Sequence, residues 1–429
     1  MTVTPWGDSR ELRARRLRPG PGVPRAEVEA NQRERLFAAM VAAVAEHGYE
    51  AIRVADVLEI SGVSRNTFYK HFDNKLDCFL ATMEAVAVGG GEAVVAAYRN
   101  HDGNWEERLA AALDALVVGI VAQPAASRLY YVESYAAGPR AIGKVEQMGE
   151  RLEQLARQAL AESPRHQALP RDLLRAILRG ARRVIQTRLR TGREHELPEI
   201  APQMLEWALC YTAPPEPLRQ RGEPSRAMFE PPPVDSDDPR ERILDAVVTL
   251  MAERGYKGLT INDIAQRAGV SLTTFYDRFD GKDEAVVAAL WHCCEQVLAA
   301  VRPAFHAAPD WPRAVAAALD AFFAYLVIEQ PFAQFGGVDV QLSSRTIVEV
   351  REEMLAGGQA FLADGFREHP GLPRIAGEAI GAAIDSLLFN QIANWGSDRL
   401  YELAPIATYL VLVPFVGVER ACALANSGR

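Results

Sequence analysis

Two stretches of the chain carry the same run of polar and aromatic side chains, whose types suit contacts with nucleic acid. One runs from Ser61 to Lys75 (SGVSRNTFYKHFDNK) and the other from Ala268 to Lys282 (AGVSLTTFYDRFDGK). They align without a gap at a constant offset of 207 residues. Hydroxyl, amide and guanidinium groups can bind phosphate oxygens, and arginine or asparagine can also pair with a base edge. One copy would be a moderate signal for such contacts, and two copies in register make a strong one.

Helices joined by tight turns must hold these side chains in place. Gly62 and Gly269 permit the turn, and Ser64 and Ser271 can each accept a hydrogen bond from the start of the next helix. A longer helix precedes each copy; we expect the first to begin at a capping Asn31 and to end at Gly48-Tyr49. Phenylalanines spaced four apart face the core of each copy: Phe68, Phe72, Phe275 and Phe279. Three helices with an exposed third helix are the outline of a helix-turn-helix DNA reader.

The wider motif resembles the tetracycline-repressor (TetR) family of bacterial regulators. The second copy is close to the family pattern, with Thr260-Ile261-Asn262-Asp263-Ile264-Ala265 ahead of the shared run. The first copy departs from it, with Arg53 in place of Thr260 and Val57-Leu58 in place of Ile264-Ala265. The specific motif covers about 48 residues in each half, and the rest matches as a helical pattern of the right length. The resemblance implies tandem TetR-like units, each with a DNA-binding head and a body for ligand binding and dimerisation.

The start of the third helix offers the groups that reach base edges. Arg65 and Asn66 are the expected base readers of the first head, and Leu272 and Thr273 occupy the same positions in the second. The resemblance implies backbone-anchoring roles for the surrounding side chains: Arg53, Ser64, Thr67, Tyr69, His71 and Lys75 in the first head, and Thr260, Ser271, Thr274, Tyr276, Arg278 and Lys282 in the second. The bland alternative for the tyrosines and lysines is a satisfied surface near a helix end.

The 429 residues, 49% apolar, suffice for more than one core, and no long strand-like alternation appears, so we predict an all-α fold of tandem units. The expected divisions are a disordered basic arm (1–29), a first head (30–76), a first body (77–213), a Pro-rich linker (214–237), a second head (238–283) and a second body (284–425). The arm would lie along DNA or remain a solvated tail. An extended linker would reach roughly 75 Å.

The bodies are predicted to be helical throughout. Expected helices in the first are 75–88, 105–121, 141–161, 171–190 and 199–211, with Gly89-Gly90-Gly91 as a break. Those in the second are 282–301, 311–328, 346–367, 375–395 and 399–418. The resemblance implies a pocket for a small, largely apolar effector, for which the second body offers aromatic and amide side chains: Phe322, Phe323, Tyr325, Phe335, Asn390 and Asn394. Core packing is the safer interpretation of any one of them.

Other function classes find little support. No nucleotide-binding loop, hydrolase or metalloprotease motif is present, so we expect no enzyme, no catalytic residue, no metal and no cofactor. The five cysteines lack metal-ligand spacing, and packing is favoured over a redox role for Cys293-Cys294. The scattered cysteines suit a reducing compartment, so we expect a cytoplasmic protein. The apolar run at 403–418 is shorter than the ~20 residues of a membrane span and carries two prolines, so we expect no membrane.

The sequence therefore predicts a regulator, more often a repressor, whose heads bind operator DNA until an effector releases them. The alternative is a constitutive architectural or protein-interaction module without an effector. Aligning Arg171 with Arg374 repeats the apolar stripe of the helices but sets Arg175 on Glu378 and Arg182 on Asp385. Because opposite charges would face each other, we expect the halves to pair within one chain, although a homodimer of two chains is the alternative.

Overall fold

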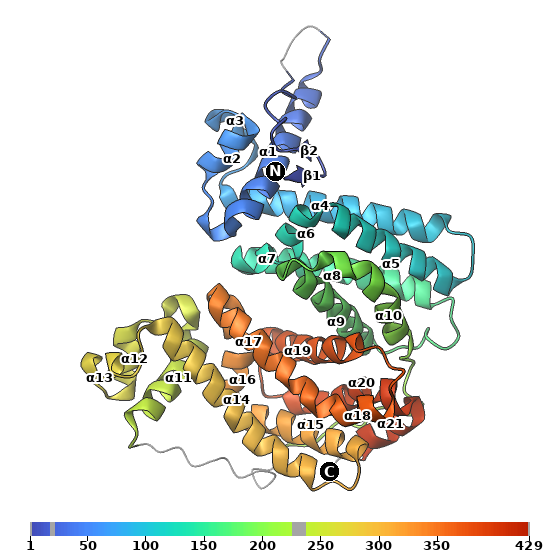
Figure 1. The fold of residues 1–429 in the computed structure, drawn as a ribbon, viewed down its shortest axis with the longest axis vertical. Helices are drawn as coiled ribbons and strands as arrows, with labels where there is room; N and C mark the ends of the chain where they lie inside the picture. The colour runs from blue at the N-terminus through green and yellow to red at the C-terminus, as the bar shows by residue number, and fades with distance from the viewer. Residues whose placement is uncertain (1, 18–21, 225–236, 428–429) are drawn as a thin grey trace. The chain divides into compact units, whose positions relative to one another are not determined.

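The computed structural model describes residues 2–17, 22–224 and 237–427 (Figure 1). The regular elements of the described residues are all helices, apart from one hairpin of two-residue strands near the N-terminus. It divides into two compact units: residues 1–167 with 182–205, and residues 168–181 with 206–429. The expectation of an all-α fold with tandem heads and bodies is confirmed.

The first unit contains one head, α1–α3, and most of the first body. Its elements are β1 (Val3–Thr4), β2 (Gly7–Asp8), α1 (Arg25–Ala51), α2 (Val54–Ser61), α3 (Arg65–His71), α4 (Lys75–Asn100), α5 (Trp105–Ala122), α6 (Pro124–Tyr131), α7 (Glu133–Ala136), α8 (Pro139–Leu160) and η1 (Glu194–Glu196). The unit boundary passes through two further helices, α9 (Arg171–Arg190) and α10 (Leu197–Leu209). One apolar core joins the head to α4, α6 and α8.

The second unit contains the other head, α11–α13, and the second body. Its elements are α11 (Pro239–Gly258), α12 (Ile261–Ala268), α13 (Leu272–Tyr276), α14 (Lys282–His306), α15 (Trp311–Ile328), α16 (Gln330–Gly337), η3 (Asp339–Leu342), α17 (Arg345–Gly357), η4 (Gly358–Leu362), α18 (Ala363–Glu368), α19 (Ile375–Trp395), η5 (Leu400–Leu403), α20 (Ala404–Val416) and α21 (Val418–Asn426). One core cluster joins this head to α14, α16 and α17, and another fills the body.

The N-terminal segment is ordered where a disordered arm was expected. Leu12 is fully buried in the core of the first head, and the ring of Trp6 lies 5.3 Å from that of Phe37. Arg13 Nε donates to the carbonyl of Glu59 at 2.8 Å, at the end of α2. The prediction of disorder is therefore wrong for residues 2–17, because two apolar side chains among the arginines find a core; residues 18–21 lie outside the described residues.

The first helix begins earlier than its expected cap. It starts at Arg25, behind Pro24, and Asn31 lies inside it. The Asn31 side chain instead holds the N-terminal segment, accepting from Leu17 N at 3.2 Å and donating to Arg15 O at 3.1 Å. Gly48 has φ +74°, a left-handed value that breaks the helical path at the expected place.

Three predictions about where helices of the bodies are continuous or broken are wrong. Gly89-Gly90-Gly91 lies within α4, which continues to Asn100, and packing of α4 against α5 offsets the weak helix propensity of glycine. The expected helix over 346–367 is instead three pieces, α17, η4 and α18. The predicted range 399–418 likewise divides into η5 and α20, with α21 following.

The first part of the linker is fixed to the second body. The buried guanidinium of Arg221 forms an ion pair with Asp320 at 3.1 Å and donates to Ala425 O at 3.0 Å. Arg219 N donates to the side chain of Asn426 at 2.8 Å. We call residues 211–224 the strap. The expected Pro-rich linker is therefore packed against the second body at Arg219 and Arg221, and 225–236 lie outside the described residues.

Within the second unit, the ends of the first body meet α19 and α20. A Cβ built on Gly180 of α9 would lie 2.6 Å from Ala379 O and 3.2 Å from Ala383 Cβ, so the two helices cross closely. The hydroxyl of Tyr211 donates to Leu410 O and that of Tyr409 to Thr212 O, both at 2.9 Å. The two hydrogen bonds are reciprocal, since 211 and 409 are separated by the same 198 residues as 212 and 410.

One predicted charge pair is wrong. Asp385 is buried and forms its ion pair with Arg351 of α17, whose guanidinium also donates to Gly336 O. Arg182, its expected partner, lies over the rings of Tyr130 and Tyr131, at 5.0 and 4.7 Å from their centroids. Arg351, from the second body itself, thus pairs with Asp385, for which the sequence alignment had predicted a partner in the first half.

Three described helices are long and apolar enough to cross a bilayer by length and composition alone. They are α4, α14 with one further residue, and α15. Residues of α14 and α15 contribute to the core clusters of the second unit.

Candidate nucleic-acid interface

The third helix of the first head presents its polar side chains to solvent. Ser64 caps α3, accepting from Thr67 N at 3.2 Å while the two hydroxyls lie 2.8 Å apart. Arg65 and Asn66, in the first turn, are both exposed, whereas Phe68 is fully buried beneath them. Because the apolar side holds α3 against the core, the predicted base readers are left on the open side.

Tyr69 continues this exposed surface. It is 46% exposed, and the Arg65 guanidinium lies 6.0 Å from the centre of its ring. The structure thus brings Ser64, Arg65, Asn66 and Tyr69 together, as the sequence predicted, in a short helix that can enter a major groove.

The second head repeats the geometry with different reading groups. Ser271 caps α13 through Thr274 N at 3.0 Å, and Phe275 is fully buried. Leu272 and Tyr276 are 45% and 54% exposed. An apolar side chain this exposed at the reading position can contact a thymine methyl group but makes no hydrogen bond to a base.

The expected anchors at the edges of the heads have mixed surroundings. Thr260 is the N-cap of α12, accepting from Asp263 N at 3.2 Å, and Arg278 is exposed. Arg53 is also exposed, and its backbone N–H donates to the Asp56 carboxylate at 2.7 Å. Thr273, a predicted base reader, is exposed as well. These four residues all lie in or next to the helix-turn-helix elements.

His71 packs inward against the first helix. Its Nε2 lies 3.0 Å from the Gln32 side-chain oxygen, and burial, with the nearby Arg33 charge, lowers its pKa from the ordinary value. A neutral imidazole held in this way favours a structural role over the predicted phosphate contact.

The two lysines expected to anchor phosphates are engaged within their own heads. Lys75 Nζ donates to Tyr49 O at 2.8 Å and Ile52 O at 2.9 Å, and lies 4.2 Å from the centre of the Tyr49 ring. Lys282 repeats this with Tyr256, at 3.2 Å from its carbonyl and 3.9 Å from its ring centre. The geometry corrects the predicted role: each lysine donates to backbone carbonyl oxygen at the end of the first helix of its head and so holds that end in place.

A second interaction that both heads share, between an arginine of the first helix and the end of the second helix, was not predicted from the sequence. Arg35, 4% exposed, donates from Nε to Ser61 O at 3.1 Å, and Arg242 donates to Ala268 O at 3.0 Å. Each guanidinium satisfies a carbonyl at the end of the second helix, just before the turn glycine. The constant offset of 207 residues, which also relates these arginines, is the sequence signal that could have found them.

The aromatic side chains proposed for an apolar pocket are core residues. Phe323 and Phe335 are fully buried and Tyr325 is 2% exposed, inside the clusters that hold the second unit together. Asn394 is exposed and donates to Asn390 O at 2.9 Å. The proposed set, with the half-buried Phe322, does not converge on one cavity.

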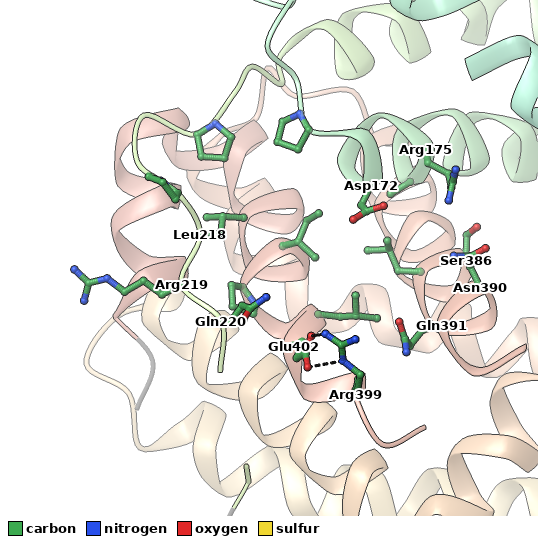
Figure 2. A pocket seen from close by; sticks show the side chains of 18 of the residues that line it. Asp172, Arg175, Leu218, Arg219, Gln220, Ser386, Asn390, Gln391, Arg399 and Glu402 are labelled. Carbon is green, nitrogen blue, oxygen red and sulfur yellow. Dashed lines mark hydrogen bonds and ion pairs between the residues drawn. The ribbon is translucent and has the colours of Figure 1, made fainter. Parts of the chain in front are cut away.

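A groove of about 790 Å³ instead lies elsewhere in the second unit (Figure 2). It is bordered by the start of α9, the strap, α19 and the segment around α20. Asn390 borders it, and it is the one member of the proposed effector set that does. The sequence analysis missed this site because its walls come from segments about 200 residues apart.

Comparison with known proteins identifies both heads as DNA-binding domains of a known type. The family model described as "Bacterial regulatory proteins, tetR family" matches residues 36–82 and 243–289, which cover both helix-turn-helix elements. Both heads are therefore TetR-family N-terminal domains. The chain carries this domain twice, as the repeated run predicted.

Curated relatives match over short segments. The chain is 32% identical over 90 residues to the "HTH-type transcriptional activator FasR" of Mycolicibacterium smegmatis, which covers 21% of this chain and 41% of that protein. It is 40% identical over 60 residues to the "HTH-type transcriptional repressor KstR2" of Rhodococcus jostii, covering 13% and 29%. The chain therefore spans less than half the length of the curated relatives that it matches.

Solved structures match over a larger share of this chain and over almost the whole of their own length. The fatty acid degradation regulator FadR from Bacillus halodurans is 21% identical, and the match covers 41% of this chain and 98% of that one, with a TM-score of 0.37. FadR from Bacillus subtilis, solved in complex with stearoyl-CoA, is 22% identical over 41% of this chain and 97% of its own, with a TM-score of 0.36.

Proposed function

We propose that this chain is a DNA-binding transcriptional regulator of the TetR family, and that it acts as a repressor. The observation that carries the proposal is the pair of helix-turn-helix heads, each with a capped third helix whose polar face is exposed. The formal charge of −9 disfavours general attraction to polyanions, so binding would depend on the local surface of the heads.

We propose that the two heads read DNA unequally. Arg65 and Asn66 can each form two hydrogen bonds to a base, which discriminate between bases by about 1–3 kcal/mol for each good pair. Leu272 offers no such bond, so the second head would contribute mainly phosphate contacts and shape. The operator would then have one sharply specified half-site and one loosely specified half-site.

We also propose that one chain supplies both heads of the functional unit. The close approach of Gly180 to Ala383 joins equivalent positions, since Ala383 is the counterpart of Gly180 in the alignment of Arg171 with Arg374. A two-fold pairing of equivalent helices produces contacts of this kind. The bonds of Tyr211 and Tyr409 add contacts between the ends of the two bodies.

The test combines a DNA selection with a mass measurement. Fragments from a random pool that bind the full chain are sequenced, and the complex with the best fragment is weighed by native mass spectrometry. We expect one 47.1 kDa chain on one asymmetric site. A perfect palindrome bound by two chains would overturn the one-chain proposal, and equal binding to every fragment would overturn sequence-specific regulation. A reporter placed behind the selected site then gives the sign of regulation, with repression expected.

The sequence predicted that a small, largely apolar effector releases the heads from DNA. The aromatic side chains proposed to bind this effector are packed in the core and do not form its site. The alternative of a constitutive DNA-binding module predicts that no small molecule changes the affinity for the selected site. A cytoplasmic location belongs to the same proposal, because a DNA-reading protein must reach the chromosome.

A further inference from the structure

The N-terminal segment lies against the turn of the first helix-turn-helix element. A Cβ built on Gly62, the turn glycine, would lie 2.8 Å from Cγ of Arg13, so the Arg13 side chain packs directly against the turn. Arg13 Nε also donates to Glu59 O, at the end of α2. Because the turn leads directly into α3, the segment borders the exposed surface that begins with Arg65.

This segment carries a positive charge that its own carboxylates only partly neutralise. It contains four arginines and two carboxylates, a net charge of +2. Arg10 forms an ion pair with Asp8 at 3.0 Å, and Glu11, the other carboxylate, is exposed. Arg13 and Arg15 donate to backbone carbonyls, which hold the two side chains in place without cancelling their charges. A positive charge is therefore left beside the turn.

Arg16 is the arginine of this segment that remains free to bind a partner. It is exposed and has no hydrogen bond or ion pair with any residue that the structure describes. Its place is fixed by its neighbours, because Leu17 N and Arg15 O are both bonded to the Asn31 side chain. Burial, with the nearby Arg16 charge, lowers the pKa of Arg35, whose guanidinium is bonded to the end of α2 just before the turn. Arg16 therefore lies close to the turn, on a positively charged surface.

The second head has no counterpart to this surface. A Cβ built on Gly269, its turn glycine, would meet no other part of the described chain within 4 Å. At the offset of 207 residues, Arg13 corresponds to Gln220, which belongs to the strap on the second body. Arg267, in the last turn of α12, is paired with Glu253 at 2.8 Å. The free cation beside the turn is thus a feature of the first head.

We propose that the N-terminal segment extends the DNA-binding surface of the first head, and that Arg16 binds a phosphate beside the bases read by Arg65 and Asn66. Two observations favour DNA as the partner: the surface is continuous with the start of α3, and its positive charge complements a phosphate backbone. Arg13 and Arg15 hold the segment in position. The inference rests on the proposed function, and it adds a phosphate contact that the second head lacks.

The test measures how the affinity of the full chain for its best selected DNA fragment depends on salt concentration. A cation that binds a phosphate releases a counterion, so each such contact contributes about 0.9 to the slope of log K against log salt concentration. Arg16→Gln should therefore flatten the slope by about 0.9, and Arg16→Lys should keep the parent slope because it keeps the charge. An unchanged slope in Arg16→Gln would overturn the inference, and so would an equal flattening in Arg16→Lys.

Arg10→Gln is the matched control. It removes the same charge from the same segment, but from a side chain that is 67% exposed and already paired with Asp8. We expect this variant to keep the parent slope. Because both arginines are exposed, both glutamine variants should also melt at the parent temperature. Equal flattening of the slope in both variants would show attraction by general charge and would overturn the phosphate contact.

The position of the contact is tested by ethylating the phosphates of the selected fragment one at a time. In the parent chain, ethylation should block binding at a phosphate next to the half-site whose base preference Arg65→Ala relaxes, and this block should disappear in Arg16→Gln. A block that persists in Arg16→Gln, or that disappears at the other half-site, would refute the assignment. If the parent chain binds no DNA fragment, the proposed function fails as well; if it binds and only the Arg16 result is negative, this inference alone fails.

Discussion

The hydroxyl of Tyr211 should stabilise the second unit measurably, because it satisfies a backbone carbonyl that its own helix cannot. The carbonyl of Leu410 would normally accept from the N–H of residue 414, but that residue is Pro414, inside α20. Tyr211 is fully buried and donates to this carbonyl at 2.9 Å. Tyr211→Phe removes the donor and leaves a buried acceptor without a partner.

The expected cost follows from the penalty for an unsatisfied buried group. Such a group destabilises a protein by about 1–3 kcal/mol. For domains of 150–250 residues, each 1 kcal/mol lowers the melting temperature by roughly 2–4 °C. We expect Tyr409→Phe to cost a similar amount, since the carbonyl of Thr212 loses its donor in the same way.

The assay is urea unfolding followed by circular dichroism, with thermal melts in parallel. Tyr276→Phe is the control, because it removes the same hydroxyl from a side chain that is 54% exposed. We expect the control to keep the parent midpoint and each buried variant to unfold at lower urea. If Tyr211→Phe unfolds together with the control, the hydroxyl contributes nothing and the reasoning about Pro414 is refuted.

Three further outcomes test the heads and the second body. Arg65→Ala should relax sequence preference at one half-site by about 1–3 kcal/mol, whereas Leu272→Ala should leave base preference unchanged. A DNA selection on each variant measures this, and equal effects of the two substitutions would contradict the proposal that the heads read DNA unequally. Lys75→Gln should lower the melting temperature but leave the salt dependence of DNA binding as it is, because its ammonium is bound to carbonyls; a flatter salt dependence would restore the phosphate role. Burial raises the pKa of Asp339 from 3.8 to about 6, so its protonated form is favoured in the fold, and the stability that it contributes at low pH is lost as the pH rises through about 6. The Asp339→Asn variant should therefore be more stable than the parent chain at pH 7.5 and should lose this advantage near pH 4. Urea unfolding midpoints of both chains at the two pH values test this, and a difference in stability that does not change with pH would contradict the raised pKa.

The sequence by itself determined the heads. The turn glycines, the serine caps and the buried phenylalanines act within about 15 residues of each other, so their spacing specifies the local geometry. That geometry then decides which side chains stay exposed, and Arg65, Asn66 and Leu272 lie where the sequence placed them. The helices at 171–190, 311–328 and 375–395 were likewise predicted to the residue, because their apolar periodicity is long and uninterrupted.

Long-range packing decided the features that the sequence left open or gave wrongly. Whether Lys75 meets phosphate or a carbonyl depends on where Tyr49 and Ile52 lie in space. Asp385 forms its ion pair with Arg351 because a buried carboxylate pairs with the cation that tertiary packing places next to it. An alignment of the two halves carries no information about that packing. The strap and the groove depend in the same way on segments about 200 residues apart, whose contact no local spacing records.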